Sequence, residues 1–242
     1  MREIRLYTDQ ALQPGQRLQL DKEATRHAVQ VLRLQPGHPL TLFNGDGFNY
    51  RARLESTTKQ ADVQVVERCE NASESPIRVR LIQGISRSER MDFTLQKAVE
   101  LGVTEIVPVF TRRSVLNLSG PRLEKKTQHW RSVVTSACEQ SGRSHVPQVW
   151  SPLPLNHYLL ENIASGCACV LVPGATQTLA TLTPQATHFS LLIGPEGGLD
   201  GDEISAALEA SFTGVSMGPR ILRTETAGIA ALAVLQARFG DF

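Results

Sequence analysis

The sequence predicts a two-part α/β protein in which a small β-barrel precedes a larger unit built around a mainly parallel sheet. Short strands around one helix occupy the first seventy residues. Strands and helices alternate from residue 77 onward, a pattern typical of a parallel sheet covered on both faces. Between the two patterns, residues 71–76 are polar and end in proline. We therefore expect domains at residues 1–70 and 77–242, joined by a linker at 71–76.

In the first part, apolar alternation and turn residues mark the strands. The predicted strands are residues 17–20, 40–43, 48–54 and 61–66. Asn44-Gly45-Asp46-Gly47 between the second and third of these is a strong signal for a hairpin turn. Residues 23–34 place apolar side chains on one helical stripe, and Pro36-Gly37 ends that helix.

In the second part, buried strands alternate with helices. The predicted strands are residues 79–85, 105–110, 146–150, 168–172, 189–193 and 214–217. A helix over residues 89–101 precedes Gly102 at the position of a C-terminal cap, and another helix starts near Pro121. The last helix is apolar around its whole circumference over residues 227–235, which favours burial and also a homodimer.

Composition places the chain among compact globular proteins. Hydrophobic residues make up 41% and charged residues 20% of its 242 residues. The first residues carry charge where a secretion signal would be apolar, and no run is long enough to span a membrane, so we expect a cytoplasmic protein. The four cysteines form no C-x-x-C pair, so we expect reduced thiols and neither a metal site nor a disulfide framework.

Charge is distributed unevenly along the chain. Residues 76–145 carry 12 basic and 6 acidic side chains, whereas residues 146–242 carry 3 and 8. A basic middle suits a nucleic acid that approaches from one side, although a solvated surface would give the same count.

Three loops that follow predicted strands are candidates for chemistry, because ligands of open α/β sheets gather at such strand ends. They cover residues 171–175, 191–199 and 217–226. The glycine-rich second loop places Glu196 and three further carboxylates where an anion would bind, which favours a neutral or cationic ligand over a phosphate. Asp200 and Glu203 can form a capping box, and Thr224 is the expected N-cap of the last helix. Spacing alone leaves open whether the loops share one ligand.

The chain resembles the ribosomal RNA uridine-N3 methyltransferases (RsmE family) of the SPOUT class over nearly its full length. The resemblance rests on residues 86–91, 96–102, 137–143, 193–198 and 218–227. The family typically has glycine at Ser88 and leucine at Met217. The resemblance implies an N-terminal PUA-like β-barrel for RNA and a C-terminal SPOUT-type α/β domain with a deep trefoil knot, a rare feature among folds.

The resemblance also implies S-adenosylmethionine as the cofactor and the small-subunit ribosomal RNA, bare or in the assembled 30S subunit, as the partner. The implied cofactor-binding residues lie in the three loops: Leu171, Val172, Pro173, Ile193, Gly194, Glu196, Gly197, Met217, Gly218, Ile221 and Leu222. The positive sulfonium of this cofactor agrees with the acidic surroundings of the second loop.

Methyl transfer to uridine N3 requires alignment of donor and acceptor and removal of the N3 proton. Arg223 is the candidate for stabilising the uridine anion, and Glu225 is the candidate proton acceptor. An equally good interpretation is that Glu225 is a first-turn carboxylate whose negative charge the helix dipole stabilises.

Four arginines are candidates for holding RNA phosphates, with surface ion pairing as the alternative for each: Arg87, Arg90, Arg113 and Arg143. Two other functions stay open at this point. One is a ribose 2′-O-methyltransferase of the same class, and the other is an RNA-binding assembly factor without enzymatic activity.

Overall fold

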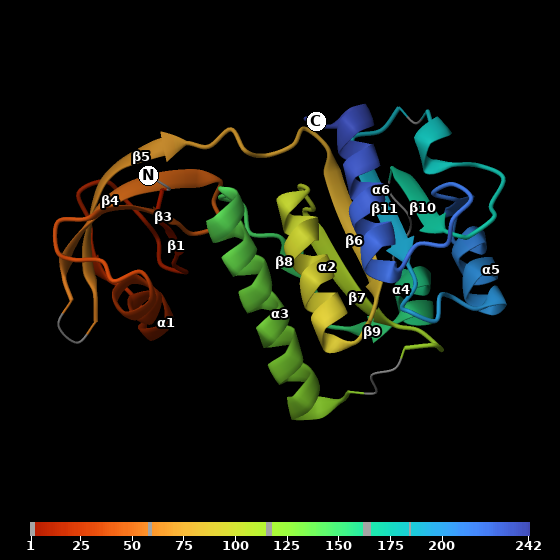
Figure 1. Cartoon of the computed structure of the whole chain (residues 1–242), viewed down its shortest axis with the longest axis horizontal. Helices are drawn as coiled ribbons and strands as arrows, with labels where there is room; N and C mark the ends of the chain where they lie inside the picture. Colours follow the sequence, from red (N-terminus) through yellow and green to blue (C-terminus); the bar gives the residue numbers. More distant parts are fainter. Residues whose placement is uncertain (1–2, 58–59, 115–117, 162–165, 184) are drawn as a thin grey trace. The chain divides into compact units, whose positions relative to one another are not determined.

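The computed structural model describes residues 3–57, 60–114, 118–161, 166–183 and 185–242, which form two compact units (Figure 1). The first unit comprises residues 1–74 together with 135–146, and the second comprises residues 75–134 and 147–242. The sequence pattern had assigned residues 135–146 to the second domain. Because chain neighbours need not be packing neighbours, this short segment at the end of a helix can group with the other unit.

The first unit contains a five-stranded sheet in the order β1-β3-β4-β5-β2. Its strands are β1 (Arg5–Tyr7), β2 (Arg17–Gln19), β3 (Pro39–Phe43), β4 (Phe48–Ser56) and β5 (Asp62–Glu70). β1 runs parallel to β3, and the other pairs are antiparallel. Gly45 and Gly47 adopt φ of +95° and +92° in the β3–β4 turn, so the predicted hairpin is confirmed. The sequence pattern missed β1, which is only three residues long.

The helix of the first unit is shorter than the sequence predicts. α1 (Lys22–Arg26) continues into a π-helical turn, η1 (His27–Val31). The amide of Ala24 donates to Asp21 Oδ1 at 2.8 Å and starts the helix. Arg33 adopts a left-handed φ of +54°, which ends the helical run before the predicted residue 34.

The second unit contains a seven-stranded sheet in which every pair is parallel. Its main order is β12-β10-β11-β6-β7-β8, and β9 also pairs with β7. The strands are β6 (Arg78–Gly84), β7 (Glu105–Phe110), β8 (Gln148–Val149), β9 (Leu153–Pro154), β10 (Cys167–Leu171), β11 (His188–Ile193) and β12 (Thr213–Val215). The predicted parallel sheet is therefore confirmed. The strand expected over residues 146–150 shrinks to two residues because Pro147 and Pro152 lie on either side of β8.

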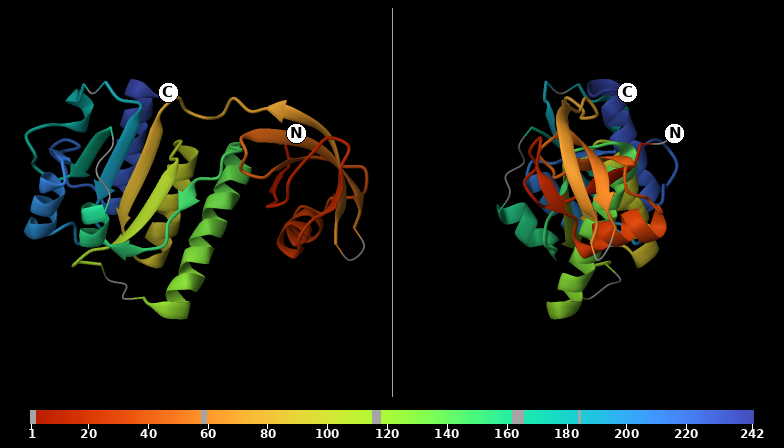
Figure 2. Two further views of the ribbon diagram at one scale, coloured as in Figure 1. Left: turned by 180° about the vertical axis from the view of Figure 1, so that it is seen from behind. Right: turned by 90° about the vertical axis from the view of Figure 1, so that its left-hand side faces the viewer.

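Helices lie on both faces of this sheet. They include α2 (Ser88–Glu100), α4 (Leu155–Glu161), α5 (Gly201–Glu209) and α6 (Thr224–Phe239), with a 3-10 turn η2 (Leu179–Thr181). Of α3 (Gly120–Ser141), residues 120–134 belong to the second unit and residues 135–141 to the first. α2 packs against α6 in front of the sheet in Figure 1, and α4 packs against α5 and β7. Seen from behind in Figure 2, α4 and α5 lie near the ends of the strands. The sequence pattern missed α4, whose seven residues make only two turns.

One apolar cluster of the second unit joins its strands to α4 and α5. Strand residues such as Ile82, Val107 and Leu192 pack with Leu155 of α4 and Ala207 of α5. Gly102 has φ of +78° directly after the last residues of α2, so the predicted C-terminal cap is confirmed.

Within the described ranges, no helix combines the length and apolar character needed to cross a membrane. In the same ranges, no three His, Cys, Asp or Glu side chains gather in an arrangement that could hold a metal ion.

Candidate functional site

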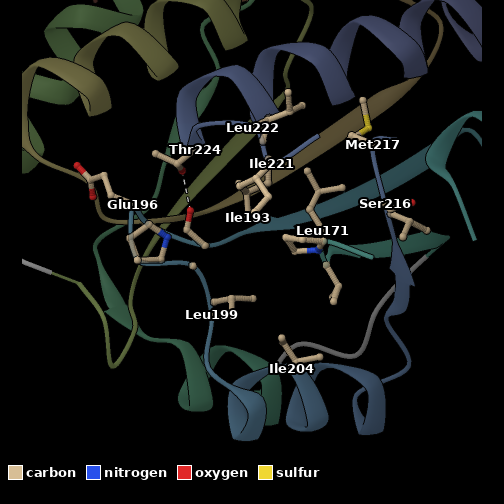
Figure 3. A pocket seen from close by; sticks show the side chains of 18 of the residues that line it. Leu171, Ile193, Glu196, Leu199, Ile204, Ser216, Met217, Ile221, Leu222 and Thr224 are labelled. Carbon is tan, nitrogen blue, oxygen red and sulfur yellow. Dashed lines mark hydrogen bonds between the residues drawn. The ribbon is translucent and has the colours of Figure 1, made fainter. Parts of the chain in front are cut away.

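The three predicted loops converge on one pocket of about 310 Å³ in the second unit (Figure 3). They follow β10, β11 and β12, which are neighbouring parallel strands, so their carboxyl ends meet at the same edge of the sheet. All eleven residues named above as cofactor-binding candidates line this pocket. Further lining residues, none of them a cofactor-binding candidate from the sequence, are Arg113, Pro195, Gly198, Leu199, Ile204, Val215, Ser216, Arg220, Thr224 and Ala227.

One part of the pocket is apolar. Figure 3 shows Leu171, Leu199 and Ile204 around the same space, and Val215 also lines it. Among the described residues that line it, Glu196 is the only carboxylate, and Arg113 and Arg220 are the only cations. This lining suits an amphipathic ligand that carries a flat apolar part and a few charged groups.

The glycine-rich loop after β11 is packed too tightly for side chains. A Cβ added to Gly194 would lie 2.7 Å from the amide nitrogen of Leu199, and one added to Gly84 would lie 2.6 Å from Pro195. Gly198 also needs a positive φ of +69°. The loop can therefore turn sharply and expose its backbone to the pocket only with glycine at these positions.

Two arginines from the loop after β7 form hydrogen bonds with this turn and with the start of α5. Arg113 Nη1 donates to the carbonyl oxygen of Gly197 at 2.8 Å, and its stem covers the α-carbon of that glycine. Arg112 Nη1 donates to Asp200 Oδ2 at 2.9 Å and to Asp202 Oδ2 at 2.6 Å. Sequence reasoning missed Arg112, and it had selected Arg113 only as an RNA contact.

The predicted capping box of α5 is confirmed. The amide of Glu203 donates to Asp200 Oδ1 at 2.8 Å, and the amide of Asp200 donates to Glu203 Oε2 at 2.9 Å. The hydrogen bond from Glu203, together with that from Arg112, keeps the pKa of Asp200 below its ordinary value.

The N-terminus of α6 differs from the sequence prediction. Arg223, not Thr224, is the N-cap residue, and its side chain makes no capping hydrogen bond. Thr224 Oγ1 instead donates to the carbonyl oxygen of Gly194 at 2.6 Å, the hydrogen bond drawn as a dashed line in Figure 3. The same hydroxyl accepts from Gln83 Nε2 at 3.0 Å. The prediction of Thr224 as N-cap was therefore wrong, because Gln83 of β6 and Gly194, directly after β11, occupy its hydroxyl. Gln83, which is fully buried, carried no pattern that could have marked it.

A charged cluster lies beside the pocket and joins α2, the loop after β11 and α6. Arg90 Nη1 is 3.5 Å from Glu196 Oε1, and Arg90 Nε is 4.0 Å from Glu225 Oε1. Glu196 Oε1 also accepts a hydrogen bond from the amide of Arg87 at 2.9 Å. The second oxygen of each carboxylate, Oε2, is buried without a hydrogen-bond partner among the described residues.

The two candidate catalytic residues border the pocket without lining it. Arg223 is exposed, whereas the Glu225 side chain is only 15% exposed. Their neighbours Leu222 and Thr224 do line the pocket. The structure thus brings both residues to the edge of the pocket, and their roles stay predictions.

The four arginines that were candidates for RNA phosphates have different surroundings. The side chain of Arg87 is exposed, and among the described residues it makes no hydrogen bond or ion pair. Arg90 and Arg113 have the protein partners given above. Arg143, in the first unit, is only 3% exposed and donates from Nη2 to Glu74 Oε2 at 2.6 Å. A phosphate contact by Arg143 would require this buried pair to open, which favours the alternative interpretation of a structural ion pair.

Family models match both units. A model described as an RNA methyltransferase domain matches residues 73–236, and one described as an RNA methyltransferase PUA domain matches residues 20–66. The chain is 34% identical over 238 residues to the ribosomal RNA small subunit methyltransferase E of Buchnera aphidicola subsp. Schizaphis graminum, with 98% of this chain and 97% of that protein covered. It is 29% identical to the protein of the same name from Bacillus subtilis, with 94% and 93% covered.

Solved structures resemble this fold closely. A methyltransferase of Legionella pneumophila, solved in complex with the bound cofactor SAM, is 40% identical with a TM-score of 0.96. A ribosomal RNA small subunit methyltransferase E of Neisseria gonorrhoeae, bound to S-adenosyl methionine, is 38% identical with a TM-score of 0.93. Both comparisons cover 100% of each chain.

Proposed function

The chain belongs to the RNA methyltransferase family that includes ribosomal RNA small subunit methyltransferase E, and from this premise we propose that it methylates N3 of a uridine in 16S ribosomal RNA with S-adenosylmethionine as methyl donor. The family accounts for the two-part fold, a PUA-like domain followed by a SPOUT-type α/β methyltransferase domain. The trefoil knot expected for this class stays a prediction.

The pocket fits the methyl donor on three grounds. Its volume of about 310 Å³ lies at the lower end of the range for small-molecule sites. Its apolar part suits the adenine, and the close-packed turn around Gly194 leaves backbone groups to recognise it. The buried Oε2 of Glu196 lacks a donor among the described residues, which the ammonium group of the methionyl part would supply. When bound, the cofactor supplies an electrophilic methyl group on its sulfonium.

The single observation that carries the proposal is the meeting of three separate loops in one pocket with an acidic lining residue. A phosphate-binding turn would present amide groups and cations to its ligand. Here the turn brings the Glu196 carboxylate to the pocket with its Oε2 buried and without a hydrogen-bond partner among the described residues, which favours a ligand group with positive charge.

Residues at the N-terminus of α6 have the chemistry that the acceptor requires. Uridine N3 must lose its proton before or during methyl transfer. Glu225 Oε2, buried and without a partner among the described residues, would accept this proton directly or through water. The exposed guanidinium of Arg223 would stabilise the negative charge that develops on the uracil oxygens.

Arg87 is the arginine best placed to hold an RNA phosphate. Its side chain is exposed, and its backbone amide donates to Glu196 of the pocket, so the guanidinium starts close to the pocket loop.

We further propose that the chain acts in the cytoplasm on the 30S subunit or its RNA and forms a homodimer. The apolar circumference of α6 supports the dimer, and its partly exposed side chains include Ile229 and Ala230.

The test is methylation of small-subunit RNA from cells that lack this protein. Purified chain, S-adenosylmethionine and either 30S subunits or bare 16S RNA are incubated, and the digested nucleosides are separated and weighed. We expect 3-methyluridine at one position. A ribose-methylated nucleoside would replace the proposal with 2′-O-methylation. RNA binding without methyl transfer, and without heat on titration of S-adenosylmethionine in calorimetry, would favour an assembly factor.

A further inference from the structure

Unpartnered buried oxygens are concentrated at one place in the second unit. Among the described residues, Gln83 Oε1, Glu196 Oε2 and Glu225 Oε2 are buried side-chain atoms without a hydrogen-bond partner. All three belong to residues that meet around the N-terminus of α6 and the turn after β11. Because a buried acceptor without a donor destabilises the fold, their retention indicates that ligands complete the site.

Arg90 lies between two of these carboxylates. It is in the first turn of α2, and its guanidinium faces Glu196 of the pocket and Glu225 of α6. The arginine side chain is 40% exposed, whereas the two glutamates are 17% and 15% exposed. The cation is therefore reachable by solvent, and the anions are largely covered.

The distances show what kind of contact this is. At 3.5 and 4.0 Å the guanidinium is an ion-pair partner of both carboxylates and a tight hydrogen-bond donor to neither. Each glutamate therefore keeps its second oxygen for another donor. Arg90 can offset the mutual repulsion of the two carboxylates without occupying the oxygens that the reactants need.

The two glutamates depend on Arg90 to different extents. Glu196 also accepts a hydrogen bond from the amide of Arg87, which a change of the Arg90 side chain would leave in place. For Glu225, the contact with Arg90 is the only ion pair or hydrogen bond of its side chain within the described ranges. Loss of the guanidinium should therefore affect Glu225 more than Glu196.

We propose that Arg90 is a positioning residue for Glu225, which holds that carboxylate beside the methyl-donor pocket, and not a phosphate contact. This inference rests on the proposed function, in which Glu225 accepts the N3 proton. This proposal replaces the expectation from sequence that Arg90 contacts the phosphates of the RNA backbone.

Steady-state methylation kinetics of Arg90→Met would test the inference. We expect kcat to fall by about 10- to 100-fold, less than the roughly 10²- to 10⁴-fold that loss of general acid–base catalysis itself would cost, because the carboxylate remains. The KM for RNA and its salt dependence should stay within about twofold of the unchanged chain. Arg90→Lys should recover part of kcat, because it restores the charge. The neighbouring exposed Glu89, changed to Gln, is the matched control and should leave kcat and KM unchanged.

A phosphate contact would give the opposite result. Arg90→Met would then raise the KM for RNA with little change in kcat, and the logarithmic salt dependence of binding would become shallower by about one. That outcome would overturn the inference. It would leave the proposed function intact, which depends on methylation by the unchanged chain.

A double-mutant cycle with Glu225→Gln separates positioning from general structural damage. We expect Arg90→Met, or Arg90→Lys if the methionine variant does not fold, to lower kcat no further in the Glu225→Gln background. Multiplicative losses would contradict the inference, because they would mean that Arg90 acts independently of Glu225. Thermal melting and S-adenosylmethionine binding of each variant show that the fold and the pocket persist.

Discussion

The helix N-termini of α5 and α6 both follow loops that line the same pocket, yet they are built in opposite ways. α5 begins with a complete capping box, and Arg112 covers its carboxylates. α6 begins with an N-cap residue whose side chain caps nothing, and Glu225 in its first turn retains a buried oxygen without a partner among the described residues. A terminus that satisfies its own groups stabilises the fold, whereas one that leaves acceptors open can receive a substrate.

The comparison predicts its largest effect at Glu225. Glu225→Gln keeps the size of the side chain but removes the proposed proton acceptor. We expect kcat for RNA methylation to fall by roughly 10²- to 10⁴-fold with an unchanged melting temperature. The exposed Glu209→Gln at the end of α5 is the control. A lower melting temperature with full activity would instead mean that Glu225 only stabilises α6, through its interaction with the helix dipole.

The next largest effect is expected at Gly194. The turn that contains it leads into α5, and its carbonyl oxygen accepts the hydrogen bond from Thr224 of α6. In Gly194→Ala the new methyl group would lie 2.7 Å from the Leu199 nitrogen, so the backbone of the turn must shift. We expect S-adenosylmethionine to bind about 10-fold or more weakly, as measured by calorimetry. Gly201→Ala provides the comparison on α5, because a Cβ there meets no atom within 4 Å. Equal affinities of both variants would show that the turn does not shape the pocket.

Thr224 should contribute chiefly to stability. Thr224→Val removes a donor to the half-buried Gly194 carbonyl and an acceptor for Gln83, which is fully buried. We expect a loss of roughly 1–3 kcal/mol in the free energy of unfolding, measured by denaturant titration. The exposed Thr226→Val should change it little. No loss at Thr224 would mean that water replaces the hydroxyl.

Asp200 should show the smallest effect and none on catalysis. Asp200→Ala removes the cap of α5, so we expect the melting temperature to fall by roughly 2–4 °C at neutral pH with methylation within twofold of the unchanged chain. Because the pKa of Asp200 is lowered in the folded chain, its stabilising contribution is complete above the ordinary carboxyl pKa and is lost as the pH falls through the lowered value. The melting temperatures of the two chains should therefore converge in acid. A strong loss of methylation would place Asp200 in the reaction and break the comparison between the two helices.

Local sequence signals predicted the features that depend on neighbours along the chain. Residues 105–110 form a strand as predicted, the glycine turn joins β3 to β4, and Asp200 and Glu203 cap α5. Each of these features needs only alternation, turn chemistry or a spacing of three residues. The pattern of strands followed by loops selected the three loops, the resemblance named the cofactor they would bind, and their position after parallel strands explains why they meet.

Only the tertiary structure decided which partners the charged and polar side chains take. Arg90 meets Glu196 and Glu225, Thr224 bonds to Gln83 and Gly194, and Arg143 is buried against Glu74. These partners lie 30 to 141 positions away along the chain. Sequence periodicity indicates which face of an element is buried, but the contact of two side chains depends on how the elements pack. The role of a charged residue near a site can therefore be assigned only when its neighbours in space are known.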